Sequence, residues 1–348
     1  MLAHLETLHL QENNLNGSIP KEISKLTFLS ELALYDNSLE GELPPTLGNL
    51  GNLTHLFLDR NKLSGQIAPN IGNLKSLSIL HLFKNQLSGP IPIELGNLKS
   101  LTELQLHENN QLFGPIPIEL GNLKFLVKLD VSENQLSSSI PSSLGNLGSL
   151  NLLHLFKNQL YGPIPIKLGN LKSLIGMELQ ENLLNGSIPS SLGNLKSLNL
   201  LYLYKNRLSG PIPIELGNLE FLARLDFSEN QLIGSIPSSF GKLKSLDFLN
   251  LFKNQLSGPI PNKLGNLKYL TDLELHENRL IGSIPSSLGN LKSLNILFLY
   301  RNNLFGPIPI ELGNLKSLIK LDLSENRLSG SIPSSLGNLK SFEYSTVV

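Results

Sequence analysis

The chain has no cysteine, no net charge and no long hydrophobic run. Its 28 basic and 28 acidic residues cancel, so no strong field draws in a polyphosphate and nucleic acid is not an expected partner. No stretch approaches the roughly 20 apolar residues that cross a bilayer. The start, Met1–Glu6, lacks the basic and apolar segments of a signal peptide. Composition therefore favours a neutral binding scaffold, with no membrane span in the chain as given; the missing cysteine alone fits a reducing compartment.

Asparagine, in contrast, recurs with a fixed period. Fourteen asparagines from Asn13 to Asn326 end the same motif and lie 24 residues apart, except for one step of 25. Such a period predicts small units that each bury an apolar face against their neighbours. No linker interrupts it from Leu5 to about Leu339. We therefore expect a single domain over residues 1–348, built from fourteen repeats.

The repeat that ends at Asn206 indicates what each position does. Leu201 and Leu203 alternate as in a short strand with one buried face, so Tyr202 and Tyr204 should point outward. One strand per repeat, always in the same direction, predicts a parallel sheet. The short amide of Asn206 can satisfy backbone groups at the turn and bond from coil to coil. The asparagine ladder is therefore predicted to be structural.

The second half of this repeat predicts a tight return path. Gly210 and Gly217 permit close or unusual backbone geometry, and Pro213 lacks an N–H and discourages a long helix. The outer side should therefore be extended or 3₁₀.

The whole unit resembles the plant extracellular class of leucine-rich repeat, L-x-x-L-x-L-x-x-N-x-L-x-G-x-I-P-x-x-L-G-N-L. Residues 89–98 (GPIPIELGNL) and 234–243 (GSIPSSFGKL) are two of the copies. The resemblance implies an α/β-type solenoid, mostly β: a right-handed superhelix with a concave parallel sheet of about 14 strands and a 3₁₀ or extended convex side. It also implies a recognition module, as in ectodomains of plant receptor-like proteins and receptor-like kinases of the male-discoverer-interacting type.

Those ectodomains usually carry cysteine pairs in caps at both ends of the solenoid. This chain has no cysteine and starts within a repeat, so we expect an internal piece without terminal caps. Location at the plasma membrane or outside the cell follows from the resemblance alone.

A longer period of 48 residues appears in the two positions before each ladder asparagine. From Phe156 onward, an aromatic residue followed by a base alternates with a polar residue followed by glutamate. The 25-residue step joins the front of an acidic unit to the back of a basic one. We infer an in-register deletion there, with a bulge at Asn109–Asn110 and an unbroken strand ladder across residues 101–131.

These alternating charges predict an ion ladder along the concave face. Parallel strands lie about 4.8 Å apart, which places Lys205 between Glu181 and Glu229, and Lys253 between Glu229 and Glu277. Exposed pairs of this kind contribute about 0–1 kcal/mol each.

The aromatic residues of the basic units predict a binding stripe. From Phe156 to Tyr300 they recur every second strand, roughly 9.6 Å, which three residues of an extended peptide would span. Duplication of one ancestral pair is the alternative explanation. The predicted ligand-binding residues are Phe83, Lys84, Phe156, Lys157, Tyr202, Tyr204, Lys205, Phe252, Lys253, Tyr300 and Arg301, with an acidic column of Asp130, Glu178, Asp226, Glu274 and Asp322.

Catalysis, metal binding and a cofactor are not expected. Carboxylate pairs such as Glu178 and Glu181 should stay wet on an open sheet, and His9, His81 and His154 should be surface residues roughly 14 Å apart. No nucleophile–base motif or phosphate-binding loop stands out from the repeat. The triplets at Asn16, Asn52 and Asn185 are glycosylation candidates if the protein is secreted.

The leading hypothesis is a receptor module in signalling or defence that binds a peptide or protein ligand, with a co-receptor kinase as a further partner. A soluble inhibitor of secreted pectin-degrading enzymes is the second hypothesis. A truncated gene product without a binding role is the third.

Overall fold

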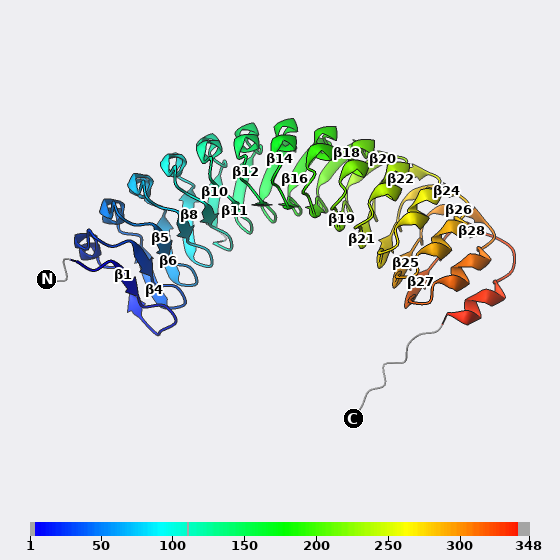
Figure 1. Cartoon of the computed structure of the whole chain (residues 1–348), viewed down its shortest axis with the longest axis horizontal. Coiled ribbons are helices and arrows are strands. Elements are labelled where there is room, and N and C mark those ends of the chain that lie inside the picture. Colours follow the sequence, from blue (N-terminus) through cyan, green and yellow to red (C-terminus); the bar gives the residue numbers. More distant parts are fainter. Residues whose placement is uncertain (1–3, 110, 340–348) are drawn as a thin grey trace, which may run out of the picture. The chain divides into compact units, whose positions relative to one another are not determined.

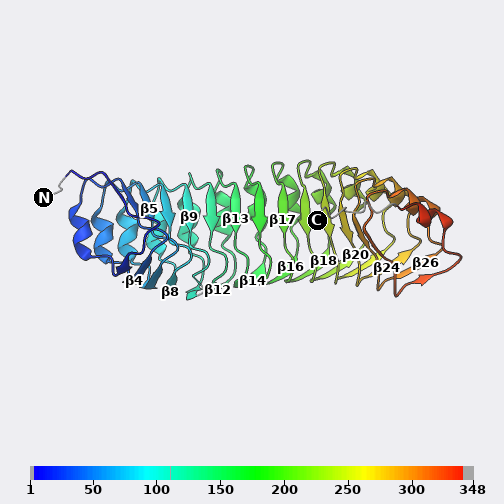
Figure 2. The same cartoon turned by 90° about the horizontal axis from the view of Figure 1, so that it is seen from below.

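A computed structural model describes residues 4–109 and 111–339, which form two compact units, residues 1–184 and 185–348. In each unit, one short strand per repeat joins a parallel sheet, here called the first sheet (Figures 1 and 2). Unit 1 contributes β1 (Thr7–His9), β3 (Glu31–Ala33), β5 (His55–Phe57), β7 (Ile79–His81), β9 (Glu103–Gln105), β11 (Lys128–Asp130), β13 (Leu152–His154) and β15 (Gly176–Glu178). Unit 2 contributes β17 (Leu200–Tyr202), β19 (Arg224–Asp226), β21 (Phe248–Asn250), β23 (Asp272–Glu274), β25 (Ile296–Phe298) and β27 (Lys320–Asp322).

A second parallel sheet, absent from the sequence prediction, pairs the extended segments of the return path. In unit 1 it holds β2 (Asn16–Gly17), β4 (Ser38–Glu42), β6 (Lys62–Gln66), β8 (Gln86–Pro90), β10 (Gln111–Gly114), β12 (Gln135–Ser138) and β14 (Gln159–Pro163). β16 (Leu183–Ser187) includes the unit boundary. Unit 2 continues with β18 (Arg207–Pro211), β20 (Gln231–Gly234), β22 (Gln255–Gly258), β24 (Arg279–Gly282), β26 (Asn303–Gly306) and β28 (Arg327–Leu328).

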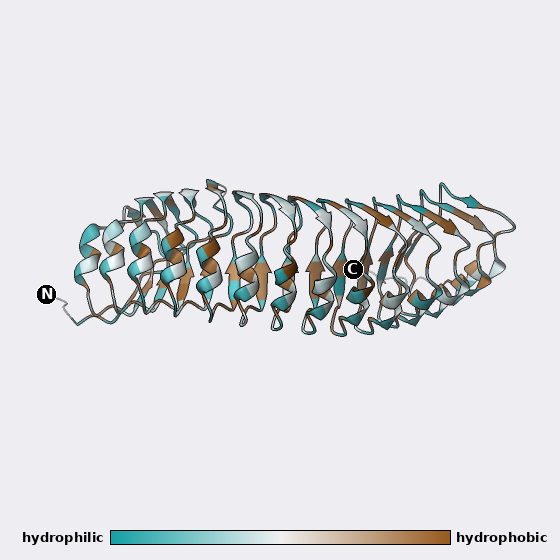
Figure 3. Cartoon of the chain, turned by 90° about the horizontal axis from the view of Figure 1, so that it is seen from above, coloured by the Kyte–Doolittle hydropathy of each residue, from teal (hydrophilic) through white to brown (hydrophobic). Residues whose placement is uncertain are grey.

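A five-residue 3₁₀ turn completes each coil, as predicted for the convex side. These turns carry both hydrophobic and hydrophilic residues (Figure 3), and not every apolar one faces the core: in η4 (Ile93–Asn97), Leu95 is fully buried whereas Ile93 is 56% exposed. The turns of unit 1 are η1 (Lys21–Lys25), η2 (Pro45–Asn49), η3 (Pro69–Asn73), η4 (Ile93–Asn97), η5 (Ile118–Asn122), η6 (Ser142–Asn146) and η7 (Ile166–Asn170). Those of unit 2 are η8 (Ser190–Asn194), η9 (Ile214–Asn218), η10 (Ser238–Lys242), η11 (Asn262–Asn266), η12 (Ser286–Asn290), η13 (Ile310–Asn314) and η14 (Ser334–Asn338).

The core between the two sheets consists of repeated leucine layers. Strand β5 pairs with β7 so that Leu56 faces Leu80, the residue 24 positions later. Equivalent leucines therefore stack from coil to coil, and both are fully buried. In the repeat used for prediction, Leu201 and Leu203 are buried and Tyr202 is outward and half-buried. The predicted inward and outward positions are confirmed.

The ladder asparagines tie each coil to the preceding one. The Asn158 amide nitrogen donates to the carbonyl oxygens of Val131 (3.1 Å), Leu155 (3.2 Å) and Phe156 (3.2 Å), and its oxygen accepts from the Leu136 N–H at 2.9 Å. One buried amide thus satisfies four backbone groups on two coils. The predicted structural role of the asparagines is confirmed.

The two glycines of the sample repeat serve different purposes. Gly210 has φ +76°, a conformation that side-chain-bearing residues rarely adopt. Gly217 has close neighbours instead: a Cβ there would lie 2.5 Å from Ser239 Cβ in the next coil. The glycine therefore sets how closely consecutive 3₁₀ turns stack.

The 25-residue repeat leaves both sheets continuous. Strand β9 pairs with β11 in a register shifted by one residue, Leu104 with Leu129, and β10 pairs with both β8 and β12. The predicted unbroken ladder across residues 101–131 is confirmed, whereas the predicted bulge falls on Asn110, outside the described residues. The Asn134 amide oxygen is buried and, among the described residues, finds no hydrogen-bond donor.

Replacing Asn158 with alanine should destabilise unit 1 strongly. The substitution leaves buried backbone groups of two coils unsatisfied, at about 1–3 kcal/mol for each such group. We expect a lower midpoint of thermal unfolding, measured by circular dichroism. Asn170→Ala on exposed η7 is the matched control and should change the midpoint little; an equal effect of both would contradict the structural role of the ladder.

Deleting Asn110 should stabilise unit 1, because the deletion restores a 24-residue repeat. Leu112 would then stand two positions after Asn109, the place from which Leu136 donates to Asn158. Its N–H would give the Asn134 oxygen a donor, a gain of about 1 kcal/mol. Hydrogen exchange of the Leu112 amide should slow in the deletion variant; unchanged or faster exchange would contradict this account.

Candidate ligand-binding face of the first sheet

The strands of the first sheet lie on the concave side of each unit (Figure 1), so their outward residues belong to the concave face. A common backbone feature shapes this face: the residue before each described ladder asparagine has φ between 49° and 55°. This left-handed conformation costs a side-chain-bearing residue roughly 1–2 kcal/mol, and the amide bonds of the following asparagine hold it. The positions are Glu12, Asp36, Arg60, Lys84, Glu108, Glu133, Lys157, Glu181, Lys205, Glu229, Lys253, Glu277, Arg301 and Glu325.

Charged side chains at these positions form the predicted ion ladder within each unit. In unit 1, Arg60 Nη1 lies 2.9 Å from Asp36 Oδ2, and Lys157 Nζ lies 3.2 Å from Glu133 Oε2. In unit 2, Lys253 Nζ lies 2.8 Å from Glu229 Oε2. Arg301 contacts the glutamates on both sides, Glu277 at 3.5 Å and Glu325 at 3.0 Å. Because the bases are exposed, the ladder contributes little to stability and fixes a pattern of charge instead.

Several of the residues two positions before the ladder asparagines carry aromatic and histidine rings, and some of these rings stack from coil to coil. His276 lies between Phe252 (4.5 Å between centroids, 11° between planes) and Tyr300 (4.3 Å, 16°) and is only 6% exposed. In unit 1, Phe83 stacks on His107 at 4.4 Å and 10°. Burial lowers the pKa of both histidines. The stacked rings therefore hold one another in place on the concave face.

The predicted aromatic stripe is less exposed than the sequence indicates. Its members are half-buried; His276 covers Phe252 and Tyr300, and His107 covers Phe83. The members are Tyr35, Phe83, Phe156, Tyr204, Phe252 and Tyr300.

The acidic column also differs from the prediction that its carboxylates stay wet. Asp130 and Asp226 are 6% and 8% exposed, and Ser132 and Ser228 each donate a hydrogen bond to the carboxylate at 2.6 Å. Burial raises the pKa of Asp226, and it also raises that of Glu274, which feels its acidic neighbours. Glu178, Glu274 and Asp322 are half-buried.

A histidine–carboxylate network surrounds Asp130 in unit 1. Nδ1 atoms of His107 and His154 lie 3.4 and 3.2 Å from Asp130 Oδ2, and His154 Nε2 lies 3.4 Å from Glu178. Burial alone would raise the pKa of Asp130, yet the hydrogen bond from His154 and the nearby His107 hold it below its ordinary value. His81 and His154, predicted as surface residues, are half-buried in this region, whereas His9 is exposed.

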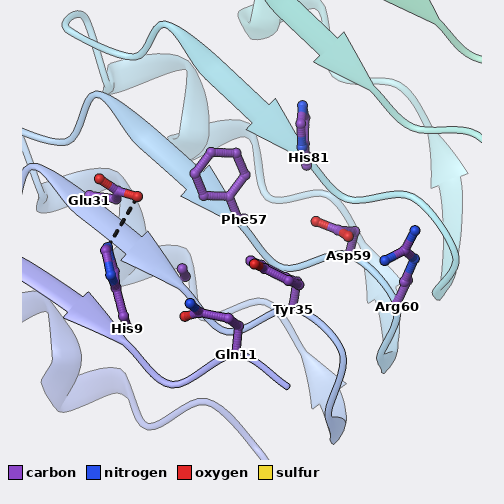
Figure 4. Close-up of a pocket in the computed structure, with 9 residues that line it drawn as sticks. His9, Gln11, Glu31, Tyr35, Phe57, Asp59, Arg60 and His81 are labelled. Atoms are coloured by element: carbon purple, nitrogen blue, oxygen red, sulfur yellow. Dashed lines mark ion pairs between the residues drawn. The ribbon is translucent and has the colours of Figure 1, made fainter. Parts of the chain in front are cut away.

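A pocket of about 320 Å³ opens on the same face near the start of unit 1 (Figure 4). Nine residues from β1, β3, β5, β7 and the segments that follow three of these strands line it. They are His9, Gln11, Glu31, Ala33, Tyr35, Phe57, Asp59, Arg60 and His81. Asp59 is 4% exposed, and burial raises the pKa of its carboxyl group from 3.8 to about 6. A buried acid that no other side chain pairs with, in a ring-lined pocket, marks a candidate binding site.

Tyr35 belongs to the predicted aromatic stripe, whereas the other eight pocket residues lie outside both the stripe and the predicted ligand-binding residues. Two departures from the repeat pattern could have revealed the pocket. Ala33 is small where other repeats carry larger side chains, and Asp59 is acidic where other repeats carry neutral ones. The glycosylation candidates Asn16 and Asn185 are exposed on the second sheet; Asn52 is exposed and its amide donates to the Thr27 carbonyl at 2.9 Å.

Metal-ligand clusters and membrane-spanning helices are both absent from residues 4–109 and 111–339. No three histidine, cysteine or acidic side chains in these ranges converge as they would around a metal ion. No helix within them has the length and apolar character to cross a membrane.

The chain belongs to the leucine-rich repeat family. Residues 1–112 and 177–299 match the model of a leucine-rich repeat region, and residues 125–147 and 317–339 match the model of a single leucine-rich repeat. Comparison with curated proteins finds no match.

Solved structures confirm the predicted resemblance to plant receptor ectodomains. The plant peptide hormone receptor RGFR1, in complex with RGF2, is 42% identical (TM-score 0.94; 96% of this chain, 54% of the receptor). The Arabidopsis receptor kinase HAESA, in complex with the peptide hormone IDA and the co-receptor SERK1, is 32% identical (0.54; 97% and 73%). A leucine-rich repeat protein of Leptospira interrogans is 34% identical (0.77; 97% and 83%). The chain thus spans about half of the RGFR1 chain.

Replacing Asp59 with asparagine should stabilise the protein at neutral pH. A carboxyl pKa raised from 3.8 to about 6 makes the folded state bind its proton more tightly. The contribution of Asp59 to the free energy of unfolding is therefore fully present below pH 3.8 and is lost as pH rises through about 6. The loss is at most roughly 3 kcal/mol.

The test compares the thermal midpoints of Asp59→Asn and wild type at pH 7.5 and pH 4. The variant should gain stability only at pH 7.5. Glu40→Gln, an exposed acid on β4, is the control and should show no such pH-dependent difference. A variant less stable than wild type at pH 7.5 would contradict the burial argument.

Proposed function

We propose that this chain is the ligand-recognition part of a plant cell-surface receptor and binds a peptide or protein on the concave face of the first sheet. One observation carries the proposal. The leucine core is complete without the outward residues, yet Phe252, His276 and Tyr300 form a continuous stack flanked by fixed charges. Rings with neighbouring bases are the side chains that most often dominate binding energy.

The similar structures support this ligand class. RGFR1 and HAESA are plant receptors whose structures contain peptide hormones, and HAESA is also bound to a co-receptor. By extension, this chain would act outside the cell, take part in signalling or defence, and meet a co-receptor kinase once its ligand is bound. The proposal assigns it no catalytic role. Glycosylation at the exposed Asn16 and Asn185 fits that setting.

A binding test can use substitutions that the repeat itself tolerates. Tyr204→Ser, Lys205→Glu, Phe252→Ser and Lys253→Glu convert two basic units into the Ser228–Glu229 type, at the same left-handed backbone position. The fold should therefore persist. Peptides captured by wild type from a phage-displayed library of random 12-residue peptides should bind this variant on the order of 100-fold more weakly, since hot-spot side chains each contribute about 2 kcal/mol or more.

The matched control makes the same chemical changes beside the convex turns. Phe125 and Tyr269 are 63% and 67% exposed, and each follows a lysine. Lys124→Glu, Phe125→Ser, Lys268→Glu and Tyr269→Ser should leave peptide affinity unchanged, as measured by calorimetry. Equal affinity of the concave variant and wild type would reject the concave face as the binding surface.

A further inference from the structure

The pocket in unit 1 exists because β3 departs from the repeat pattern. Its middle outward residue is Ala33, whereas the equivalent positions on β1 and β5 carry His9 and Phe57. The missing side chain leaves a hollow between its neighbours, and Ala33, 2% exposed, lies among the residues that line it. A volume of about 320 Å³ suits one side chain of a ligand rather than a whole molecule.

Aromatic rings form one wall of this hollow. Phe57 packs against Tyr35 at 6.4 Å and 81°, and against His81 at 5.1 Å and 66°. In Figure 4 the Phe57 and His81 rings lie above the Asp59 carboxylate and the Tyr35 ring lies below it. Ring faces carry partial negative charge and attract cations within about 6 Å.

Asp59 supplies a full negative charge in the same hollow. Its carboxylate points between Phe57 and Tyr35 (Figure 4) and, among the described residues, no other residue donates a hydrogen bond to it. The adjacent Arg60 also lines the pocket, but its Nη1 pairs with Asp36 at 2.9 Å, and its guanidinium lies 5.6 Å from the Phe83 ring. The Asp59 carboxylate is 4% exposed and, within the described part of the chain, accepts a hydrogen bond only from its own backbone N–H, so its charge is costly to bury.

The other charged groups that line the pocket already have partners. His9 Nε2 lies 3.1 Å from Glu31 Oε1, and His81 Nε2 lies 3.3 Å from Glu103 and 2.7 Å from the Gln105 amide. Within the described ranges, Asp59 is therefore the one charged lining residue without an ion pair or a hydrogen bond from another side chain.

We propose that this pocket binds a cationic side chain, a lysine or arginine of the ligand, with Asp59 as its counter-ion and Tyr35, Phe57 and His81 around it. This assignment rests on the proposed function, in that the cation is part of a bound peptide or protein. It adds an anchoring position to the binding face next to Tyr35 of the aromatic stripe, and it restricts which ligands fit.

The pocket can be tested directly, without knowledge of the ligand. The chain has four alanines, of which only Ala33 lines the pocket, so ¹³C-methyl alanine labelling gives it a separate NMR signal. At pH 7.5, n-butylammonium and n-butylguanidinium should shift the Ala33 signal saturably, whereas neutral n-pentanol should not. The Ala68 signal, next to η3, should stay unchanged.

Two isosteric variants separate the role of Asp59 from a general loss of charge. Asp59→Asn should weaken n-butylammonium binding by at least about tenfold, because it removes the counter-ion. Glu40→Gln removes an exposed acid of β4, in the second sheet, which is no part of the predicted binding set. This control should bind the cation as wild type does.

The random-peptide library gives the second readout. Peptides captured by wild type and by Glu40→Gln should share a lysine or arginine at one position, and those captured by Asp59→Asn should not. Peptides that bind the stripe without any such preference, together with no saturable Ala33 shift, would overturn the cation pocket and leave the proposed function intact. If no peptides are captured, the proposed function fails, and the titration alone then decides whether the pocket takes a cation.

Discussion

The buried asparagine amide at the end of each first-sheet strand is the interaction on which the rest of the structure depends. Asn158 bonds to backbone groups of its own coil and of the preceding coil. Those bonds fix the spacing between coils and hold the preceding residue, Lys157, at φ 49°. The core leucines can stack only because successive coils keep this spacing. One side chain thus couples local turn geometry to long-range order.

This constraint also shapes the binding face. A fixed left-handed residue in every repeat gives each ladder charge a defined place, so Arg301 reaches glutamates on both neighbouring strands. The rings one position earlier are brought close enough to stack, as Phe252 and His276 do. Recognition surfaces that are rigid before binding lose less entropy when a ligand arrives. The ladder therefore prepares the face as well as the fold.

The sequence predicts what repeats and misses what arises from single departures. The core leucines, the ladder asparagines and the charges of the ion ladder all recur with the repeat, so the sequence alone reveals them. Burial of Asp130 is not, because it depends on His107 and His154 from the strands on either side. The pocket is less visible still, since Ala33 matters only through the bulk of its neighbours. Pairing of the return path into a second sheet also escapes prediction, because strands such as β8 and β14 contain only one buried side chain, a leucine.

Three buried acids of the first sheet show how partners decide the state of a carboxyl group. Asp130, between two histidines, keeps its pKa below the ordinary value despite burial. Asp226 has only neutral donors, Ser228 and Asn250, and burial prevails to raise its pKa. Asp59 has no side-chain donor among the described residues, and its pKa reaches about 6. Burial of the Asp59 carboxylate in a pocket lined by rings is unfavourable by itself. The proposed cation of a ligand would supply the missing counter-charge.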